Sequence, residues 1–298
     1  MNEINSVFDR FKYLNSNIEL DFDLYISIIT VLIAKKNLLL SSTRTATTLL
    51  ELEIILGRVL AIGYTVVDIK DIENDDFSDG EGIWIIKNLD NVATFYQKKL
   101  YDYLQCHQDK NVIILIENDS GIEVELVNEL NDKILFRQFQ SYENSNDNID
   151  EVLQLTLANP FQPETGLHNS KQIFQNLHDS IKTITIVPEI KRYYNDIIIF
   201  LRNHRMVKIN SLKNILKAEF EIMLRTLCVI NRLGYCIPIL VKNCAKKFFP
   251  LHLILISRYE EETSLVYGSD PKIVKAIFDK WDNDLVVEDA LGRIQPPL

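Results

Sequence analysis

The chain has 298 residues, of which 47% are hydrophobic, and a formal net charge of −10 at pH 7. This length suits one large domain or two modest ones, and the apolar content is enough for a substantial core. The acidic balance argues against a protein dedicated to nucleic-acid binding, although it leaves room for a local basic face.

Cysteine and histidine usage predicts no metal site. The four cysteines form no CxxC pair, and the five histidines are scattered without the spacing of a metal motif. We interpret the even spacing of Cys228, Cys236 and Cys244 as a coincidence. Because no signal peptide is recognised, we expect reduced thiols and a cytoplasmic or nuclear location.

The first half alternates short apolar runs with longer amphipathic ones. Residues 24–34 predict a buried helix, since this apolar run is too short to span a membrane. Residues 37–42 (NLLLSS) predict a buried strand, and residues 49–60 a helix with a leucine stripe. The later elements are strands at residues 63–69, 83–92, 111–118 and 133–140, and a helix at residues 93–105.

This order predicts an α/β fold with a mostly parallel sheet and flanking helices. Strands separated by helices of this length need crossover connections. Near-continuous apolar strands indicate a sheet that is buried on both faces. Ligands in such folds bind beyond the carboxyl ends of the strands. The turns after Ser42, Asn88 and Glu117 are therefore the candidate site region.

The second half is predicted to be helical. Residues 154–187 are weakly patterned and end in a strand-like run, and the helical pattern starts at Pro188. Helices are predicted at residues 189–207, 211–234 and 237–256, the second closed by Gly234. We therefore divide the chain into an α/β domain at residues 1–187 and a helical domain at residues 188–298.

The turn SSTRTATT (residues 41–48) stands where a nucleotide-binding α/β protein places its phosphate loop. A working loop needs glycines, so that backbone N–H groups can wrap the phosphates, and a lysine; this turn has neither. We interpret Thr48 as the N-cap of the following helix. The alternative is weak nucleotide binding by Arg44, Thr47, Thr48 and Asp90.

The third strand would carry the acidic pair that holds magnesium in an ATPase of this kind. Asp90 is the only acid near that place and Asn91 follows it, so we favour a turn cap as the role of Asp90. Glu117 and Asp119 end the next strand, where many such ATPases place a polar sensor. The sequence predicts no catalytic residue.

A basic cluster follows in the carboxyl half, and we define it as Arg192, Arg202, Arg205 and Lys208. If residues 189–207 form a helix, Arg202 and Arg205 lie three apart on one face. One interpretation is a contact with a phosphate, a nucleic acid or an acidic partner. A solvated helix end is favoured, because cations stabilise the C-terminal turn of a helix.

Three segments of the carboxyl half are distinctive: RYYNDIIIFLRNHRM (residues 192–206), FFPLHLILI (residues 248–256) and SLVYGSDPKIV (residues 264–274), with a terminal PP. In this order they resemble a fungal family, maintenance of telomere capping protein 2, from Pro188 onwards. Within the third segment, Asp270 is predicted to cap a helix that begins near Pro271.

Residues 235–253 (YCIPILVKNCAKKFFPLHL) are similar to the V-x-P-x-x-V helix start in the lid of MoxR-type AAA+ ATPases. The preceding helix of that lid should carry a sensor arginine, but here it has Lys213 and Lys217 and no arginine near its start. The resemblance implies an AAA+ architecture with a lid-like second domain and a degenerate ATPase site.

Together these observations predict a non-catalytic AAA+-like scaffold that binds an unidentified protein partner, without a cofactor and without a membrane association. A role in telomere capping is implied by the family resemblance only. The alternative is a divergent nucleotide-dependent ATPase or switch. A nucleic-acid binder that uses the basic cluster is a third hypothesis, which the acidic net charge disfavours.

Overall fold

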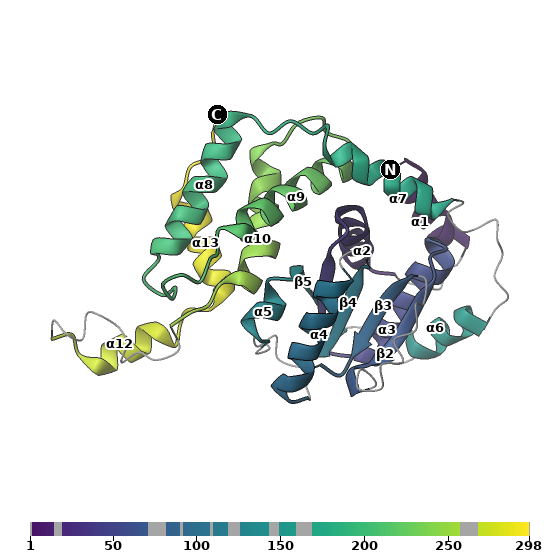
Figure 1. Ribbon diagram of the computed structural model, residues 1–298, viewed down its shortest axis with the longest axis horizontal. Helices are drawn as coiled ribbons and strands as arrows, with labels where there is room; N and C mark the ends of the chain where they lie inside the picture. Colours follow the sequence, from purple (N-terminus) through teal and green to yellow (C-terminus); the bar gives the residue numbers. More distant parts are fainter. Residues whose placement is uncertain are drawn as a thin grey trace. The chain divides into compact units, whose positions relative to one another are not determined.

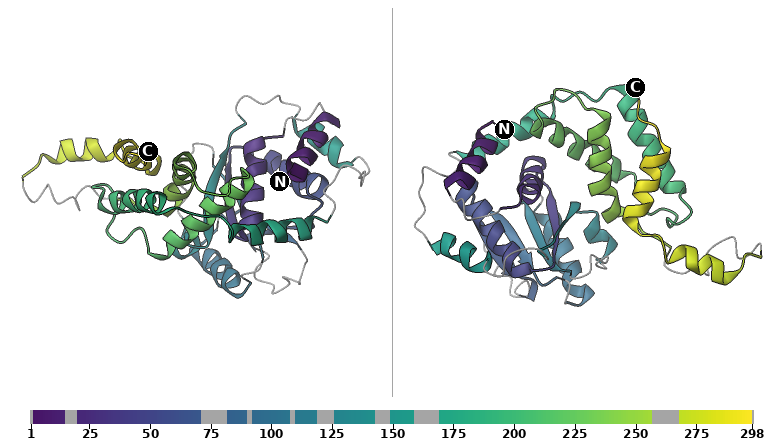
Figure 2. Two further views of the ribbon diagram at one scale, coloured as in Figure 1. Left: turned by 90° about the horizontal axis from the view of Figure 1, so that it is seen from above. Right: turned by 180° about the vertical axis from the view of Figure 1, so that it is seen from behind.

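The structure is a computed structural model that divides into two compact units, Met1–Lys182 and Thr183–Leu298 (Figures 1 and 2). The boundary lies five residues before the one expected from the sequence, at 187/188. The residues that the structure describes are 2–14, 20–70, 82–89, 92–107, 110–118, 126–142, 149–158, 169–256 and 268–297.

The first unit opens with α1 (Asn2–Leu14) and α2 (Phe22–Ala34). Asp21 caps α2, because its carboxylate accepts a hydrogen bond from the backbone N–H of Asp23 at 2.8 Å. Lys35 ends the helix in the left-handed conformation, at φ 53°. The predicted buried helix at residues 24–34 is confirmed, and none of the helices described is long and apolar enough to cross a membrane.

A five-stranded parallel sheet in the order β2-β3-β4-β1-β5 is the centre of this unit. Its strands are β1 (Asn37–Ser42), β2 (Tyr64–Asp68), β3 (Ile83–Lys87), β4 (Val112–Glu117) and β5 (Ile134–Gln140). Leu39 pairs with Ile114, and Ile85 with Ile113. The four apolar residues of β3 that precede Lys87 are all buried. The predicted α/β fold with a parallel sheet is therefore confirmed.

Helices cover both faces of the sheet (Figure 1). The chain crosses from β1 to β2 through α3 (Thr45–Glu53) and a π-helix, η1 (Ile54–Val59). It moves in the opposite direction along the sheet through α4 (Thr94–Cys106) and α5 (Asn128–Asn131). Because such crossovers are right-handed, opposite directions place α3 and α4 on opposite faces.

Two helices occupy the region that the sequence left weakly patterned, α6 (Ile149–Ala158) and α7 (Ser170–Ile181). In α7 only Ser170, Phe174 and Ile181 are buried, so the apolar stripe is sparse. The strand-like run at its end is not a strand: Thr185 makes one isolated parallel bridge with Tyr235.

The second unit is helical. Its helices are α8 (Pro188–Asn203), α9 (Ile215–Ile230), α10 (Pro238–His252), α12 (Pro271–Phe278) and α13 (Asn283–Arg293). Helix α10 packs against α8, α9 and α13. Phe220 of α9 stacks on Phe249 of α10 with ring centroids 4.9 Å apart, and also meets Phe248.

The ends of these helices correct the predicted ranges. The helix predicted to close at Gly234 ends at Ile230, and Arg232 takes the left-handed conformation instead, at φ 57°. Proline begins three helices as expected, since its fixed φ suits the first turn. Asp270 caps α12 as predicted, accepting from Lys272 N at 2.9 Å.

Each unit contains one of the two tryptophans. Trp84 of β3 is 2% exposed and stacks on Tyr103 at a centroid distance of 4.6 Å. Trp281, between α12 and α13, meets the ring of His204 edge to face at 5.1 Å.

Candidate functional site

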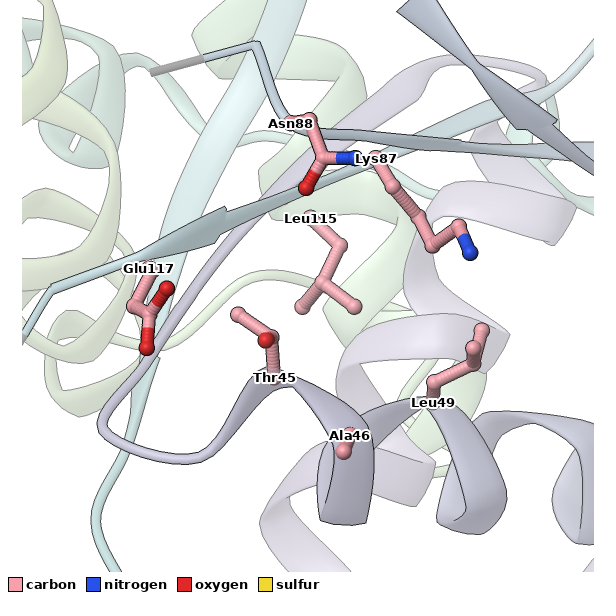
Figure 3. Close-up of a pocket in the computed structure, with 7 residues that line it drawn as sticks. All are labelled: Thr45, Ala46, Leu49, Lys87, Asn88, Leu115 and Glu117. Atoms are coloured by element: carbon pink, nitrogen blue, oxygen red, sulfur yellow. The ribbon is translucent and has the colours of Figure 1, made fainter. Parts of the chain in front are cut away.

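A pocket of about 210 Å³ lies at the carboxyl ends of β1, β3 and β4, the edge at which parallel sheets bind ligands. We call it the strand-end pocket, and it involves all three turns that the sequence singled out. Its lining residues are Thr45, Ala46, Leu49, Lys87, Asn88, Leu115 and Glu117 (Figure 3).

Two charged side chains of opposite sign line this pocket. Lys87 ends β3 and Glu117 ends the neighbouring strand β4, and Figure 3 shows Leu115 between them. Lys87 is half-buried, whereas Glu117 is exposed. The pocket therefore offers a cation and an anion to a ligand, with an apolar surface between them.

Asn88 connects the pocket to the end of β2. It adopts the left-handed conformation at φ 63°, and its amide donates a hydrogen bond to the Asp68 carboxylate at 2.5 Å. The pKa of Asp68 is lowered, first by the hydrogen bond from Lys70 N–H and then by Asn88 and by the charges of Lys70 and Lys87. Asp68 thus remains a carboxylate that fixes Asn88 at the strand end.

Thr48 is not among the residues that line the strand-end pocket, and it is not the helix cap that the sequence suggested. Helix α3 begins at Thr45, and the cap position is Arg44, whose side chain makes no capping bond. The buried Thr48 hydroxyl lies 2.7 Å from Ser42 Oγ and 3.1 Å from the Arg44 carbonyl. The helix starts one turn earlier than predicted, because Ser42 Oγ accepts the Arg44 N–H at 3.0 Å and turns the chain there.

The other residues of the alternative nucleotide site are placed as follows. Thr47 is buried and donates from its hydroxyl to the Asp150 carboxylate of α6 at 2.6 Å. Arg44 is exposed and is not among the residues that line the pocket. Asp90 and Asp119 lie outside the described residues. The hydroxyls of Thr47 and Thr48 are thus both engaged within the fold.

A buried polar network lies beneath the turn between β1 and α3. The Tyr142 hydroxyl donates to the Glu51 carboxylate at 2.8 Å and lies 3.3 Å from Thr48 Oγ1. Burial raises the pKa of Glu51 to about 7; the Tyr142 hydrogen bond opposes this rise, and the charge of Asp21 adds to it. The turn thus packs against the Glu51 carboxyl, whose charge can change near neutral pH.

Sequence reasoning missed Lys87 and Glu51. The expected third strand ran to residue 92, which placed Asp90 near its end, whereas β3 ends at Lys87. The apolar run IWII indicated the true end of the strand. The residue that follows this run, Lys87, is the one expected at the carboxyl edge of the sheet, where ligands bind. For Glu51 the signal was an acid between two leucines of a helix that packs on a sheet.

The basic cluster does not form one helical face. Helix α8 ends at Asn203, so Arg205 lies beyond it and does not share a helical face with Arg202. Arg202 donates to the Asn214 side chain at 2.9 Å, while Arg192 is exposed on α8 and Lys208 is exposed beyond it. The helix ends because the chain turns at His204, whose N–H donates to the Leu201 carbonyl.

His204 is fixed between α8 and α13. Its Nε2 lies 3.5 Å from Asp289 Oδ2, and Asp289 also accepts from Arg293 Nε at 2.9 Å. Burial lowers the pKa of His204, although the charge of Asp289 opposes this shift. The arrangement joins two helices of the second unit.

The three cysteines of the carboxyl half, Cys228, Cys236 and Cys244, are all buried in the second unit. Cys236 Sγ lies 3.8 Å from the Ile237 carbonyl, and burial raises the pKa of Cys244 well above its usual value. All three are free thiols. Among the described residues, no group of three His, Cys, Asp or Glu side chains is arranged to hold a metal ion.

No protein-family model matches the chain. It is similar to maintenance of telomere capping protein 2 of the yeast Lachancea thermotolerans, at 26% identity over 212 residues, which cover 68% of this chain and 67% of that protein. The Saccharomyces cerevisiae protein of the same name is 26% identical over 154 residues, which cover 44% of this chain and 42% of the relative. The chain thus spans less than half of that relative's length. These relatives confirm the resemblance read from the carboxyl half.

The fold is similar to a crystal structure described as a putative ATPase from Cytophaga hutchinsonii. The TM-score is 0.72 at 11% sequence identity, and the match covers 100% of this chain and 96% of that chain. At this identity the likeness shows the fold alone.

Proposed function

We propose that the chain is an AAA+-like scaffold that binds a protein partner in telomere capping, acts in the nucleus, and does not hydrolyse ATP. The telomere role is carried over from the names of its relatives. The fold likeness supports the AAA+-like architecture. The residues of the strand-end pocket support the absence of hydrolysis.

The end of β3 is the observation that carries this proposal. In an ATPase of this fold a strand-end carboxylate holds the magnesium ion that bridges the β- and γ-phosphates. Here the strand ends in Lys87, and Asn88 follows it, so a cation stands where a metal needs an anion. The loop opposite has no glycine, and the hydroxyls of Thr47 and Thr48 are engaged within the fold, whereas Thr45 lines the pocket.

Titration calorimetry and a turnover assay test the loss of hydrolysis. We expect the full chain to release no phosphate from ATP above the level of an enzyme-free blank, with or without magnesium. An active AAA+ ATPase in the same assay serves as the positive control. Micromolar ATP binding together with turnover that Asp90→Ala abolishes would overturn the proposal.

The partner is sought by affinity purification with mass spectrometry from fungal nuclei. We expect proteins that act at telomeres to be enriched with the tagged full chain over an untagged control. Enrichment of no protein above that control would contradict a scaffold role.

A nucleotide-dependent switch is the second candidate, and Lys87 favours it. Its ammonium lines the strand-end pocket and could meet a phosphate in place of the missing loop lysine. A ligand that binds only the folded state raises the melting temperature. The switch therefore requires an increase in Tm at millimolar ATP that is lost in Lys87→Met and retained in the exposed-site control Lys98→Met. No increase in the unmodified chain counts against it.

A further inference from the structure

Positive charge is concentrated where α8 connects to α9 in the second unit. From Lys191 to Lys217 the chain has seven lysines and arginines and one acid, Asp196, although the whole chain has a net charge of −10. All eight of these charged side chains are exposed. An acidic protein thus carries a local basic segment, which attracts anionic groups.

Side-chain contacts bring the two helices together at this place. Arg202, in the last turn of α8, donates to the Asn214 side chain at the start of α9, at 2.9 Å. The Lys217 ammonium of α9 lies 5.8 Å from the ring centroid of Tyr194 in α8. The cations of both helices therefore belong to one region of the second unit.

Backbone hydrogen bonds fix the connection between these helices. Lys208 N–H donates to the Ile254 carbonyl at 2.8 Å, and Ile256 N–H donates to the Met206 carbonyl at 2.9 Å. Ser211 Oγ accepts the Ile254 N–H at 2.6 Å. The side chains of the connection thus extend from a backbone that is already ordered, which lowers the entropic cost of binding a partner.

Three isoleucines are exposed among the cations. Ile199 of α8 is 54% exposed, Ile209 of the connection 83%, and Ile215 at the start of α9 63%. Ile199 lies one turn before Arg202, and Ile215 directly follows Asn214. Exposed apolar side chains grouped within a polar rim are typical of protein-binding sites. We define the corner surface as Ile199, Arg202, Lys208, Ile209, Lys213 and Ile215.

The combination of cations and isoleucines favours an acidic protein segment over a nucleic acid. Proteins that bind single strands stack the bases on exposed aromatic rings. Here Tyr193 and Tyr194 are buried, and Phe200 is half-buried. A duplex presents phosphates to such a surface, which leaves the isoleucines without an apolar partner. A protein segment can instead offer carboxylates to the cations and apolar side chains to the isoleucines.

We propose that the corner surface is where the scaffold binds its protein partner, and that the partner contributes an acidic segment with apolar side chains. This inference rests on the proposed scaffold function and adds to it the surface and the chemistry of the partner. The isoleucines cover the apolar side chains of that segment, and Arg202, Lys208 and Lys213 pair with its carboxylates. Buried apolar contacts hold such a complex, whereas exposed charge pairs speed its association and set its specificity.

Fluorescence anisotropy with labelled peptides tests the proposal on the full chain. The glutamate peptide has about 16 residues, the length of α8, with leucine at positions i, i+3, i+4 and i+7 and glutamate elsewhere. We expect it to bind. A peptide with lysine in place of glutamate, and another with alanine in place of leucine, should each bind more weakly by about tenfold or more, because one lacks the carboxylates and the other the apolar side chains.

Charge-reversal variants assign the binding to the corner surface. Lys208→Glu/Lys213→Glu keeps the hydrogen bond between α8 and α9 and should weaken binding of the glutamate peptide by about tenfold or more. Lys12→Glu/Lys98→Glu is the matched control, since it changes the net charge equally at exposed sites of the first unit. The control should keep the affinity within about twofold of the unmodified chain.

A third variant tests the apolar part of the surface. Ile209→Ser should weaken binding of the glutamate peptide by about fivefold, and it should leave binding of the alanine peptide unchanged. Circular dichroism checks that each variant is folded. If the charge-reversal variant does not fold, Ile209→Ser and the three peptides still decide.

Three outcomes would overturn the proposal. One is a glutamate peptide that does not bind at millimolar concentration. A second is an equal loss of affinity in Lys12→Glu/Lys98→Glu, since net charge and not the corner surface would then be responsible. The third is a DNA duplex that binds more tightly than the glutamate peptide and loses affinity in Lys208→Glu/Lys213→Glu, which would make the surface a nucleic-acid interface.

Affinity purification with the same variant separates this inference from the scaffold function. Lys208→Glu/Lys213→Glu should lose proteins that the unmodified chain captures. Equal capture by both chains would refute the corner surface and leave the scaffold role intact. No capture by the unmodified chain, together with specific binding of the glutamate peptide, would refute the scaffold role and leave the corner surface as a binding site for acidic segments.

Discussion

Glu51 is a carboxylic acid in a place where the fold disfavours charge. It is 1% exposed, and its one hydroxyl donor among the described contacts is Tyr142. Burial of an ionised carboxylate costs more free energy than one hydrogen bond returns, which is why its pKa rises to about 7 from the usual 4.5. The consequence is a dependence of stability on pH.

We expect the free energy of unfolding to fall as the pH rises from about 4.5 to about 7, where the folded chain holds a proton on Glu51 that the unfolded chain has released. The loss amounts to at most about 3 kcal/mol, at roughly 1.4 kcal/mol per pKa unit. Glu51→Gln should remove this part of the pH dependence. Urea unfolding of both proteins at pH 5 and at pH 8 measures it.

The exposed Glu129→Gln is the control for that comparison, and it should leave the difference between the two pH values unchanged. Equal pH dependence in Glu51→Gln and in the unmodified chain would show that Glu51 keeps an ordinary pKa.

At the level of single residues, the sequence predicted the site's position better than its members. The strand-turn-helix order located the edge of the sheet, because apolar runs fix where strands lie. It did not show that the Thr48 hydroxyl faces Ser42, and the end of β3 was placed beyond Lys87, since both depend on a boundary shift of a few residues. The hydrogen bond between Glu51 and Tyr142 joins residues 91 positions apart, so the local sequence could not predict it.

Helix ends in this chain depend on side-chain caps to differing degrees. Asp21, Asp270 and Asp282 each accept a backbone N–H of the first turn, whereas Arg44 at the start of α3 accepts none. Among these four helices, α3, which lines the strand-end pocket, is therefore the one that starts without a side-chain cap. Asp282 offers the best test, because α13 packs against α10 and α8.

Asp282→Ala should destabilise the second unit by about 1 kcal/mol, because Leu285 N–H loses its acceptor, now 2.7 Å away. Asp282→Asn retains an oxygen in the same place and should cost much less. Urea unfolding followed by circular dichroism measures both. If the Asn variant loses as much as the Ala variant, the charge and not the cap is responsible.

Among the elements, the five strands and the proline-started helices were predictable, and α6 and α7 were not. Strands β3 and β4 are apolar along nearly their whole length, and the other three contain shorter apolar or β-branched runs, so each gives a local signal. Helix α7 buries few residues, and the periodicity of such a sparse stripe is weak. The end of α9 was misplaced because Arg232, a residue that rarely takes positive φ, does so here.

At the scale of the whole molecule, residues 183–187 decide where the second unit begins. Thr185 exchanges backbone hydrogen bonds with Gly234 and Cys236, while Ile184 and Ile186 are buried. These contacts place the segment with the helical unit, although it precedes the first helix. A division made at Pro188 would cut through them.

A fragment of residues 183–298 should therefore be more stable than a fragment of residues 188–298, by about 2 kcal/mol or more, since the shorter one loses two backbone hydrogen bonds and two buried isoleucines. Thermal unfolding of the two fragments side by side measures the difference. Equal stability would place the functional boundary at 187/188.

The distribution of the two tryptophans has a practical consequence. Trp84 lies in the sheet beneath Lys110, and Trp281 lies beside His204 in the helical unit. Replacing either indole by phenylalanine leaves a chain with a single tryptophan, and its emission, excited at wavelengths that tyrosine does not absorb, reports on one unit at a time. The protein thus carries its own optical probe for each half, and the unfolding of sheet and helices can be followed separately in the intact chain without an added label.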